Sequence, residues 1–474
     1  MEQRRSESNR PANPRRRKRT KFEIFKESYL PLIIAGIALI LILVIIVGSI
    51  VRAVQRKQVY TEASIAASEE QARIDAEAQD IIAKTKQMAS HYDFEGAMAL
   101  IDGFSGNPED YPEMGTLYAQ FEYGQSQLVP YEDYNSIPNL SFDMLVVDPG
   151  RGFADEEMGD DIEDDYITIT EFQNILQQLY NNGYMLVHPQ EFVTTGINDF
   201  GIEAYIAKPL MLPAGKKPII ITQTNVCYSM DLVDGDGDKV ADQGGLGFAS
   251  RMVIGTDGKV DCEYIDGFGQ TAVGAYDLVP ILDDFVDAHP DFSYKGAKAT
   301  LAVSGHEGVF GYRTNSEAEN YFGSAVYSQQ VESAKAVAKA LKESGYNLAC
   351  YTYGNTAYGT LELAEIQSEM ELWTNEVKPI IGSIDTFVFA QESDINEGII
   401  YTGDKYNVLK EKGFVYYIGF CFEPEPWTVV VDEYIRQGRI AVTGDALYSD
   451  TEWFEGIFDK TLVIDTAARE GTAE

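Results

Sequence analysis

The pattern of hydrophobic and polar positions changes twice along this chain, near residue 52 and near residue 137. Residues 30–51 contain no charged side chain and are long enough to cross a hydrocarbon core of about 30 Å as a helix. Between the two changes, sequence rich in Ala, Glu and Gln predicts helices over residues 59–87, 92–101 and 111–123. Beyond residue 137, short apolar runs alternate with amphipathic ones, which predicts an α/β domain.

The most informative stretch is residues 217–230, KPIIITQTNVCYSM. Its apolar start is followed by Thr222, Gln223, Thr224 and Asn225, so it predicts a buried strand that ends in polar side chains. The C-terminal ends of parallel strands are where α/β folds place their functional groups. We therefore expect any binding or catalytic site to include the end of this strand.

Helix signals repeat with a regular spacing. Thr168 and Glu171 form a capping-box pattern before an amphipathic helix. Three predicted helices are followed by a glycine, an aromatic residue and a strand, with the glycines at Gly183, Gly345 and Gly413. This cadence is typical of a layered α/β domain or barrel.

Charge predicts the topology of the chain. Residues 1–28 carry ten Lys or Arg and four Asp or Glu, a net charge of +6, whereas the whole chain has −38. The positive-inside rule then places the N-terminus in the cytoplasm and the rest outside the plasma membrane. We expect a basic tail over residues 1–28, a single-pass signal-anchor helix over 29–52, a helical stalk over 53–132 and an extracellular domain over 133–474.

The acidic remainder of the chain, near −44, argues against nucleic acid as a partner. Four cysteines, Cys227, Cys262, Cys350 and Cys421, show no metal-ligand spacing and are too few for a disulfide framework. We expect them to be small buried apolar residues.

Several stretches of the outer domain resemble the polysaccharide deacetylases, the NodB-homology group of carbohydrate esterases. They are residues 221–228, 247–253 (GFASRMV), 277–298, 308–314 (GVFGYRT), 344–354 and 434–444. The resemblance implies a distorted (β/α) barrel of about seven strands, of the glycoside hydrolase and deacetylase type, with its site at the strand C-termini. It also implies zinc, held by an Asp and two His, with a second Asp as the general base.

The residues that should do this chemistry are absent. The Asp pair aligns with Thr224 and Asn225, and the His pair aligns with Tyr351 and Asn355. Thr443 stands where a late motif commonly carries an Asp, and Asn139 and Asp143 stand where we expect histidines. None of Thr, Asn or Tyr offers an anion or an imidazole near neutral pH, so no zinc is expected.

We therefore expect a catalytically inactive relative that binds a cell-wall or other glycan, or a partner in the cell envelope. Hydroxyl, amide and aromatic groups suit sugars, which makes Thr224, Asn225, Tyr351, Asn355 and Trp427 the candidate binding residues. One alternative is an active N-deacetylase or other hydrolase with an altered mechanism. Another is a structural envelope scaffold that acts through its stalk.

A second group of side chains resembles a calcium loop. Asp234, Asp236, Asp238 and Asp242 occupy positions one, three, five and nine of such a loop. Lys239 replaces the usual glycine at position six, and Gly245 replaces the glutamate at position twelve. Calcium binding and a solvated acidic turn are both open.

Overall fold

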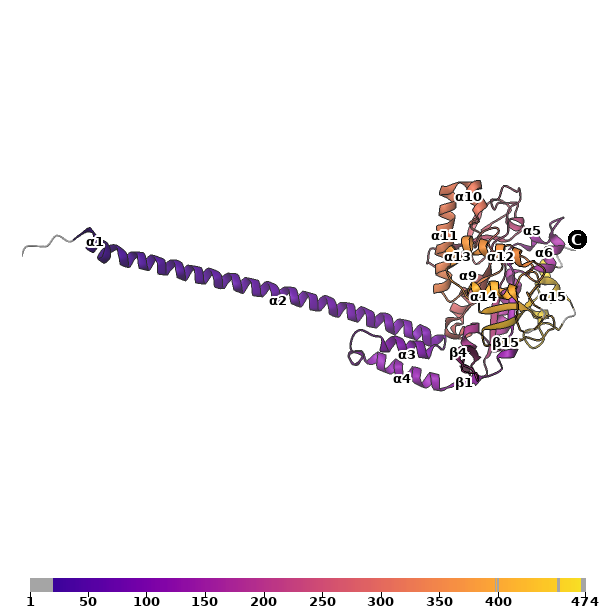
Figure 1. Ribbon diagram of the computed structural model, residues 1–474, viewed down its shortest axis with the longest axis horizontal. Coiled ribbons are helices and arrows are strands. Elements are labelled where there is room, and N and C mark those ends of the chain that lie inside the picture. Colours follow the sequence, from indigo (N-terminus) through magenta and orange to yellow (C-terminus); the bar gives the residue numbers. More distant parts are fainter. Residues whose placement is uncertain (1–19, 397, 399, 450–451, 470–474) are drawn as a thin grey trace, which may run out of the picture. The chain divides into compact units, whose positions relative to one another are not determined.

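The computed structural model describes residues 20–469 apart from 397, 399, 450 and 451 (Figure 1). Residues 1–19, most of the predicted basic tail, therefore lie outside the described part. The chain divides into two compact units, residues 1–80 and 81–474. Each is described here by itself.

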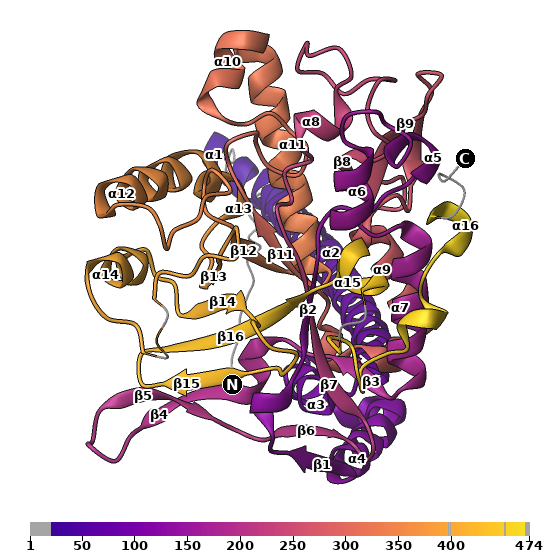
Figure 2. The ribbon, with the colours of Figure 1, turned by 90° about the vertical axis from the view of Figure 1, so that its right-hand side faces the viewer.

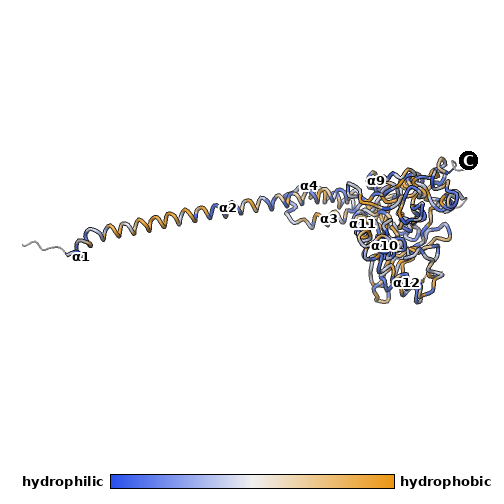
Figure 3. Tube along the Cα trace, turned by 90° about the horizontal axis from the view of Figure 1, so that it is seen from above, coloured by the Kyte–Doolittle hydropathy of each residue, from blue (hydrophilic) through white to orange (hydrophobic). Residues whose placement is uncertain are grey.

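The described residues of the first unit are almost wholly helical, and its last helix continues into the second unit. Its helical stretch begins at Lys21, and α2 (Leu30–Ser90) contains both the predicted span and the predicted helix over residues 59–87. Figure 3 shows the part of α2 that follows α1 (Lys21–Ile24) as a hydrophobic stretch. Within the described residues, this is the one helix long and apolar enough to cross a membrane. No break in the helix separates a membrane span from a stalk.

The second unit is built on a closed ring of seven parallel strands (Figure 2). In chain order they are β2 (Asn139–Phe142), β7 (Lys217–Gln223), β11 (Thr300–Val303), β12 (Asn347–Cys350), β13 (Thr386–Val388), β14 (Tyr416–Phe420) and β16 (Tyr434–Ala441). Pairing of β11 with β7 closes the ring. The barrel predicted from the sequence is confirmed, and the stretch at residues 217–230 supplies strand β7.

Helices surround the ring (Figure 2). They include α7 (Ile169–Asn181), α9 (Leu278–Ala288), α11 (Ser324–Glu343), α12 (Leu363–Leu372) and α14 (Asp404–Glu411). The Thr168 capping box forms as predicted, and Gly183, Gly345 and Gly413 all have positive φ after their helices. Glu171 is also fully buried against Arg469, with Nε and Oε1 2.7 Å apart, so the chain end is fastened to α7.

Smaller elements extend the barrel. β3 (Tyr184–Leu186) pairs with β7, and β15 (Thr428–Val431) runs antiparallel to β16. The remaining sheets are β1 (Leu128–Tyr131) with β6 (Leu210–Pro213), β4 (Val193–Ile197) with β5 (Glu203–Ala207), and β8 (Ala249–Ile254), β9 (Val260–Ile265) and β10 (Thr271–Gly274). The second unit also holds α3 (Phe94–Asp102) and α4 (Pro112–Ser126), which pack on each other through Phe94 and Phe121.

Alternation along the strands decides which side chains fill the barrel. Ala302, Ala349, Val388 and Ile418, from four neighbouring strands, belong to one small buried cluster. Tyr351 belongs to it too, whereas the adjacent Cys350 packs in the large outer core. Residues that pair with this set across the ring, or lie two positions away, therefore point inward.

Candidate functional site at the barrel mouth

The inward alternation ends in a layer of seven side chains at the C-terminal mouth of the barrel. Each ring strand contributes one residue near or just beyond its C-terminal end: Asp143, Thr224, Ser304, Tyr351, Ala390, Phe420 and Arg439. Besides the serine, four of the seven side chains are polar. This is unusual for a barrel interior, because each buried polar group needs a hydrogen-bond partner. The mouth layer is therefore the natural site in this fold.

A hydrogen-bonded group forms within this layer. The Thr224 hydroxyl donates to the Phe142 carbonyl at 3.1 Å and approaches Asp143 Oδ2 at 3.4 Å. The Tyr351 hydroxyl is close enough to Thr224 and Arg439 for both to influence its pKa, and the Arg439 guanidinium carbon lies 5.9 Å from the Tyr351 ring centroid. Thr224, Tyr351 and Arg439 are all buried, and Asp143 keeps a partly exposed edge. We call Asp143, Thr224, Tyr351 and Arg439 the mouth cluster.

The electrostatics of the mouth cluster are set mainly by burial. Loss of water contact raises the pKa of Asp143 to about 7, against smaller opposite effects of the Met144 amide and the Thr224 hydroxyl. Burial also raises the pKa of Tyr351 to about 12, although the nearby Arg439 guanidinium opposes this. Near neutral pH, Asp143 can thus exchange a proton while Tyr351 stays protonated.

Arg439 brings a buried positive charge to the site. Its guanidinium carbon lies 3.9 Å from the ring centroid of Phe420 and 5.9 Å from that of Tyr351, and Nη1 donates to the Gly419 carbonyl. Burial lowers its pKa from the usual range, but a guanidinium remains charged at neutral pH. The mouth therefore combines a cation with hydroxyl groups and one titrating carboxyl.

The other residues singled out from the sequence lie apart from the mouth cluster. The Asn225 Oδ1 accepts from Ser304 Oγ at 3.0 Å, and the Asn355 Oδ1 accepts from Gln391 Nε2 at 3.2 Å. Thr443 caps α15 (Gly444–Tyr448) by accepting from the Ala446 amide. A role in capping a helix explains this threonine without any ligand.

Trp427 precedes β15 and is half-buried. Its indole N–H donates to the Phe420 carbonyl at 3.2 Å, and Arg436 lies 5.5 Å from its ring centroid. It therefore lies beside the mouth layer rather than within it.

Backbone conformations at the mouth are unusual. Five non-glycine residues with positive φ follow ring strands: Asn225, Thr352, Asn355, Gln391 and Glu392, with φ between 48° and 58°. Asn tolerates this region, but Thr is β-branched, and a residue of either kind costs about 1–2 kcal/mol more than in its preferred region. Such strain persists where the surrounding structure enforces it, typically at ligand sites.

The donor set of this site does not fit zinc. Thr224, Asn225, Tyr351 and Asn355 supply neither thiolate, imidazole nor carboxylate, and the Arg439 guanidinium would repel a divalent cation. Asp143 is the sole carboxylate in the mouth layer. No zinc-dependent step can be derived from these residues.

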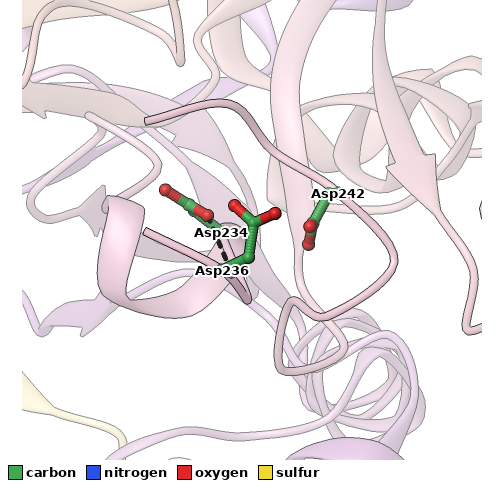
Figure 4. A group of neighbouring side chains, drawn as sticks. All are labelled: Asp234, Asp236 and Asp242. Carbon is green, nitrogen blue, oxygen red and sulfur yellow. Dashed lines mark hydrogen bonds between the residues drawn. The ribbon is translucent and has the colours of Figure 1, made fainter. Parts of the chain in front are cut away.

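The acidic loop is the one group of three metal-ligating side chains found among the described residues (Figure 4). Oxygens of Asp234, Asp236 and Asp242 lie within 4.8 Å of one another, while Asp238 lies outside this group. Backbone amides already occupy much of the cluster: Asp234 accepts from Gly237 and Lys239, at 2.8 and 2.6 Å. Calcium binding at this loop stays a prediction.

Asp143 and Arg439 were not among the binding residues expected from the sequence. Asp143 was noted for its alignment, and Arg439 belongs to the YIRQGR stretch of β16. Their common signal is position, because both continue the inward alternation near the C-terminal end of a ring strand: Asp143 directly follows β2, and Arg439 lies inside β16 opposite Phe420. Following the inward alternation one residue past β2, and along β16 itself, would have identified both. The thiols agree with expectation: none of the four described cysteines forms a disulfide, and three are buried.

Comparisons with known proteins give a similarity of fold. No family model matches the sequence, and no curated protein matches it. The Streptococcus pyogenes deacetylase PplD in complex with acetate is 11% identical, with a TM-score of 0.34, over 67% of this chain and 94% of that one. The Bacillus anthracis protein BA0330, described as a polysaccharide deacetylase, is 12% identical, with a TM-score of 0.33, over 68% and 69%. Identities and TM-scores this low assign no family to the chain. The evidence for the barrel is the strand pairing of this chain itself.

Proposed function

We propose that this protein is a membrane-anchored, outward-facing carbohydrate-binding protein whose barrel has no zinc-dependent deacetylase activity. The observation that supports it is the mouth cluster. It presents hydroxyl groups, one carboxyl and one guanidinium, which are groups that hydrogen-bond sugar hydroxyls. The substituted positions are polar, whereas a purely structural barrel end would be filled more cheaply by apolar side chains.

The strained loops add support. Residues after β7, β12 and β13 hold positive φ around the same mouth, which fixes the positions of Asn225, Asn355 and Gln391 before a ligand arrives. A preformed site loses less conformational entropy on binding. The sequence resemblance to carbohydrate esterases points to sugars as the ligand class. The apolar helix α2 and the charge difference around it support the anchor and its orientation.

The test uses the full-length protein in detergent micelles. Calorimetric titration with chitin oligosaccharides and with peptidoglycan fragments should give measurable affinity, with no acetate released and no stoichiometric zinc in the purified protein. Tyr351→Phe removes one hydroxyl from the mouth cluster and should weaken binding about tenfold. Tyr123→Phe, at a tyrosine that is 69% exposed on α4, is the matched control and should leave binding unchanged.

Two outcomes would contradict the proposal. Stoichiometric zinc together with acetate release would establish an active metal-dependent deacetylase. Absence of binding to any glycan, with loss of partner capture when residues 53–132 are deleted, would instead favour the structural scaffold.

A second candidate function is hydrolysis without a metal, and the pKa of Asp143 favours it. In this scheme, Asp143 takes a proton from water as the water oxygen bonds to an amide carbonyl carbon. The C–N bond then breaks, and the proton passes to the departing amine. Arg439 and Tyr351 would stabilise the negative charge that develops on the carbonyl oxygen. Metal-independent acetate release that rises with pH through about 7 and is lost in Asp143→Asn would support this function over the first.

A further inference from the structure

A cavity of about 910 Å³ lies beside the mouth layer, between the segments that follow β13 and β14 and the start of β15 and β16. Its lining includes the aromatic residues Phe420, Phe422 and Trp427 and the charged residues Glu392, Asp394 and Arg436. The volume is within the range of small-molecule sites, and aromatic faces with a few polar groups are their usual lining.

The floor of this cavity is rigid and electrically neutral. Arg436 Nη2 and Asp394 Oδ2 are 2.8 Å apart, with both side chains largely buried, and the Tyr401 hydroxyl donates to the same carboxylate oxygen at 2.7 Å. The guanidinium also lies 4.0 Å from the Tyr401 ring centroid. Asp394 and Arg436 therefore pair with each other at the floor. Glu392 is the third charged side chain of the lining; it is exposed, and its carboxylate also feels the Arg439 guanidinium of the mouth cluster.

The aromatic side chains are held differently. Trp427 is fixed through its indole N–H and its packing against Gly438, where a Cβ would come within 2.3 Å of Nε1. Phe422, by contrast, is 74% exposed, so its side chain is not part of the buried core. A large exposed aromatic residue on a cavity rim is a common feature of ligand contacts, because it offers apolar area with little entropy loss on binding.

The cavity and the mouth layer share one side chain, Phe420. Phe420 lines the cavity and also stacks on Arg439 of the mouth cluster. Glu392 of the cavity follows Gln391, whose amide reaches Asn355 on the neighbouring loop. Both Gln391 and Glu392 hold positive φ, so the segment that joins the two places is the most strained part of the mouth. The cavity therefore adjoins the mouth cluster through Phe420 and the segment after β13.

We propose that this cavity is a saccharide subsite for a neutral or positively charged amino sugar, stacked on Phe422 and Trp427 and paired with Glu392. The subsite rests on the proposed carbohydrate-binding function and extends it to a substrate class. A sugar ring presents C–H groups to an aromatic face and hydroxyls to polar neighbours. An ammonium group gains further from an aromatic face and from the carboxylate. The acidic domain and Glu392 both repel an anionic sugar.

Binding of three oligosaccharides to the full-length protein in micelles tests this subsite. The probes are tetramers of glucosamine, of N-acetylglucosamine and of galacturonic acid, titrated at low and at high salt. Glucosamine and N-acetylglucosamine should bind and galacturonate should not. Added salt should weaken the binding of glucosamine alone, since only that sugar pairs its charge with Glu392.

Variants locate the subsite. Phe422→Ala should weaken binding of both neutral and cationic tetramers about tenfold. Phe268→Ala, at an 86% exposed phenylalanine in the turn between β9 and β10, is the matched control and should change nothing. Glu392→Gln should reduce glucosamine affinity about threefold and leave N-acetylglucosamine affinity unchanged.

The outcomes separate the subsite from the wider function. If the wild type binds glycan, Tyr351→Phe weakens it and Phe422→Ala behaves like Phe268→Ala, the subsite is wrong while carbohydrate binding at the mouth stands. Galacturonate that binds as tightly as glucosamine would overturn the charge argument. If no tetramer binds the wild type, the proposed function fails and the subsite fails with it.

Discussion

Arg439 is the residue that most changes the chemistry of the mouth. A guanidinium that is almost fully buried keeps its charge, so its neighbours must accommodate it. Here they do so with an aromatic face from Phe420, a backbone carbonyl and the Tyr351 oxygen. The same charge makes a metal ion unfavourable at this place and leaves Asp143 as the titrating group.

Asp143 gives a pH-dependent stability that can be measured. The folded chain holds this proton up to about pH 7, whereas an unfolded chain releases it near pH 4. The unfolded state therefore binds fewer protons between these values, and the free energy of unfolding falls as pH rises from about 4 to about 7. Stability from this carboxyl is fully present below pH 4 and lost above pH 7.

Asp143→Asn should remove this dependence. Relative to wild type, the variant should gain roughly 2 kcal/mol of unfolding free energy between pH 4.5 and pH 8, after allowance for the partly exposed edge of the carboxyl. Urea unfolding of both proteins at the two pH values measures it. The exposed Asp199→Asn is the control and should show no such gain. If the unfolding free energies of variant and wild type differ by the same amount at both pH values, the raised pKa of Asp143 is wrong.

At the scale of elements, the loops after the ring strands hold the site. The segment after β13 is the clearest case, because Gln391 and Glu392 are consecutive residues with φ of 52° and 48°. Neither is glycine, so each pays the steric cost of the left-handed region. Their side chains are exposed, which excludes core packing as the reason.

Substitution at Gln391 measures the strain in this loop. Gln391→Gly and Gln391→Ala both remove the amide that reaches Asn355, but only glycine accepts positive φ without a steric cost. We expect the glycine variant to be about 1 kcal/mol more stable than the alanine variant in urea unfolding. Equal stabilities would mean that the loop is not held in this conformation in solution. A glycine variant that also binds glycan more weakly would link the strain to the site.

At the scale of the molecule, the chain consists of two units whose surfaces differ in polarity. Residues 30–51 of α2 expose apolar side chains along their length, which costs too much in water to be tolerated without a cover. By length and composition, this segment could cross a bilayer. The barrel unit has a large buried core of its own and a strongly acidic composition.

Deletion of residues 1–51 tests the anchor. The full chain should remain with membranes after an alkaline carbonate wash, and the shortened chain should appear in the soluble fraction. Deletion of residues 2–19 keeps the apolar segment and should remain with membranes, which separates anchoring from charge on the tail. Recovery of the full chain in the soluble fraction would contradict the anchor. Digestion of the barrel by protease added to intact cells would establish the outward orientation.

The sequence by itself determined what depends on local pattern. Apolar length predicted the helix around residues 30–51, and a short continuous β-branched run predicted β7. The glycine cadence predicted the helix ends at Gly183, Gly345 and Gly413. It also predicted that Thr224 and Tyr351 end ring strands and lie at one mouth, because parallel strands bring their C-terminal ends to the same edge.

Tertiary structure alone decided what the mouth contains. Asp143, Thr224, Tyr351 and Arg439 come from four strands spread over about 300 residues, and only closure of the ring by β11 and β7 brings them together. Burial within the ring raises the pKa of Asp143. Loop conformations place Asn355 against Gln391 and leave Asp238 outside the group of three carboxylates. A local sequence pattern cannot specify such distant contacts, because burial and charge at one residue depend on side chains contributed by every other strand of the ring.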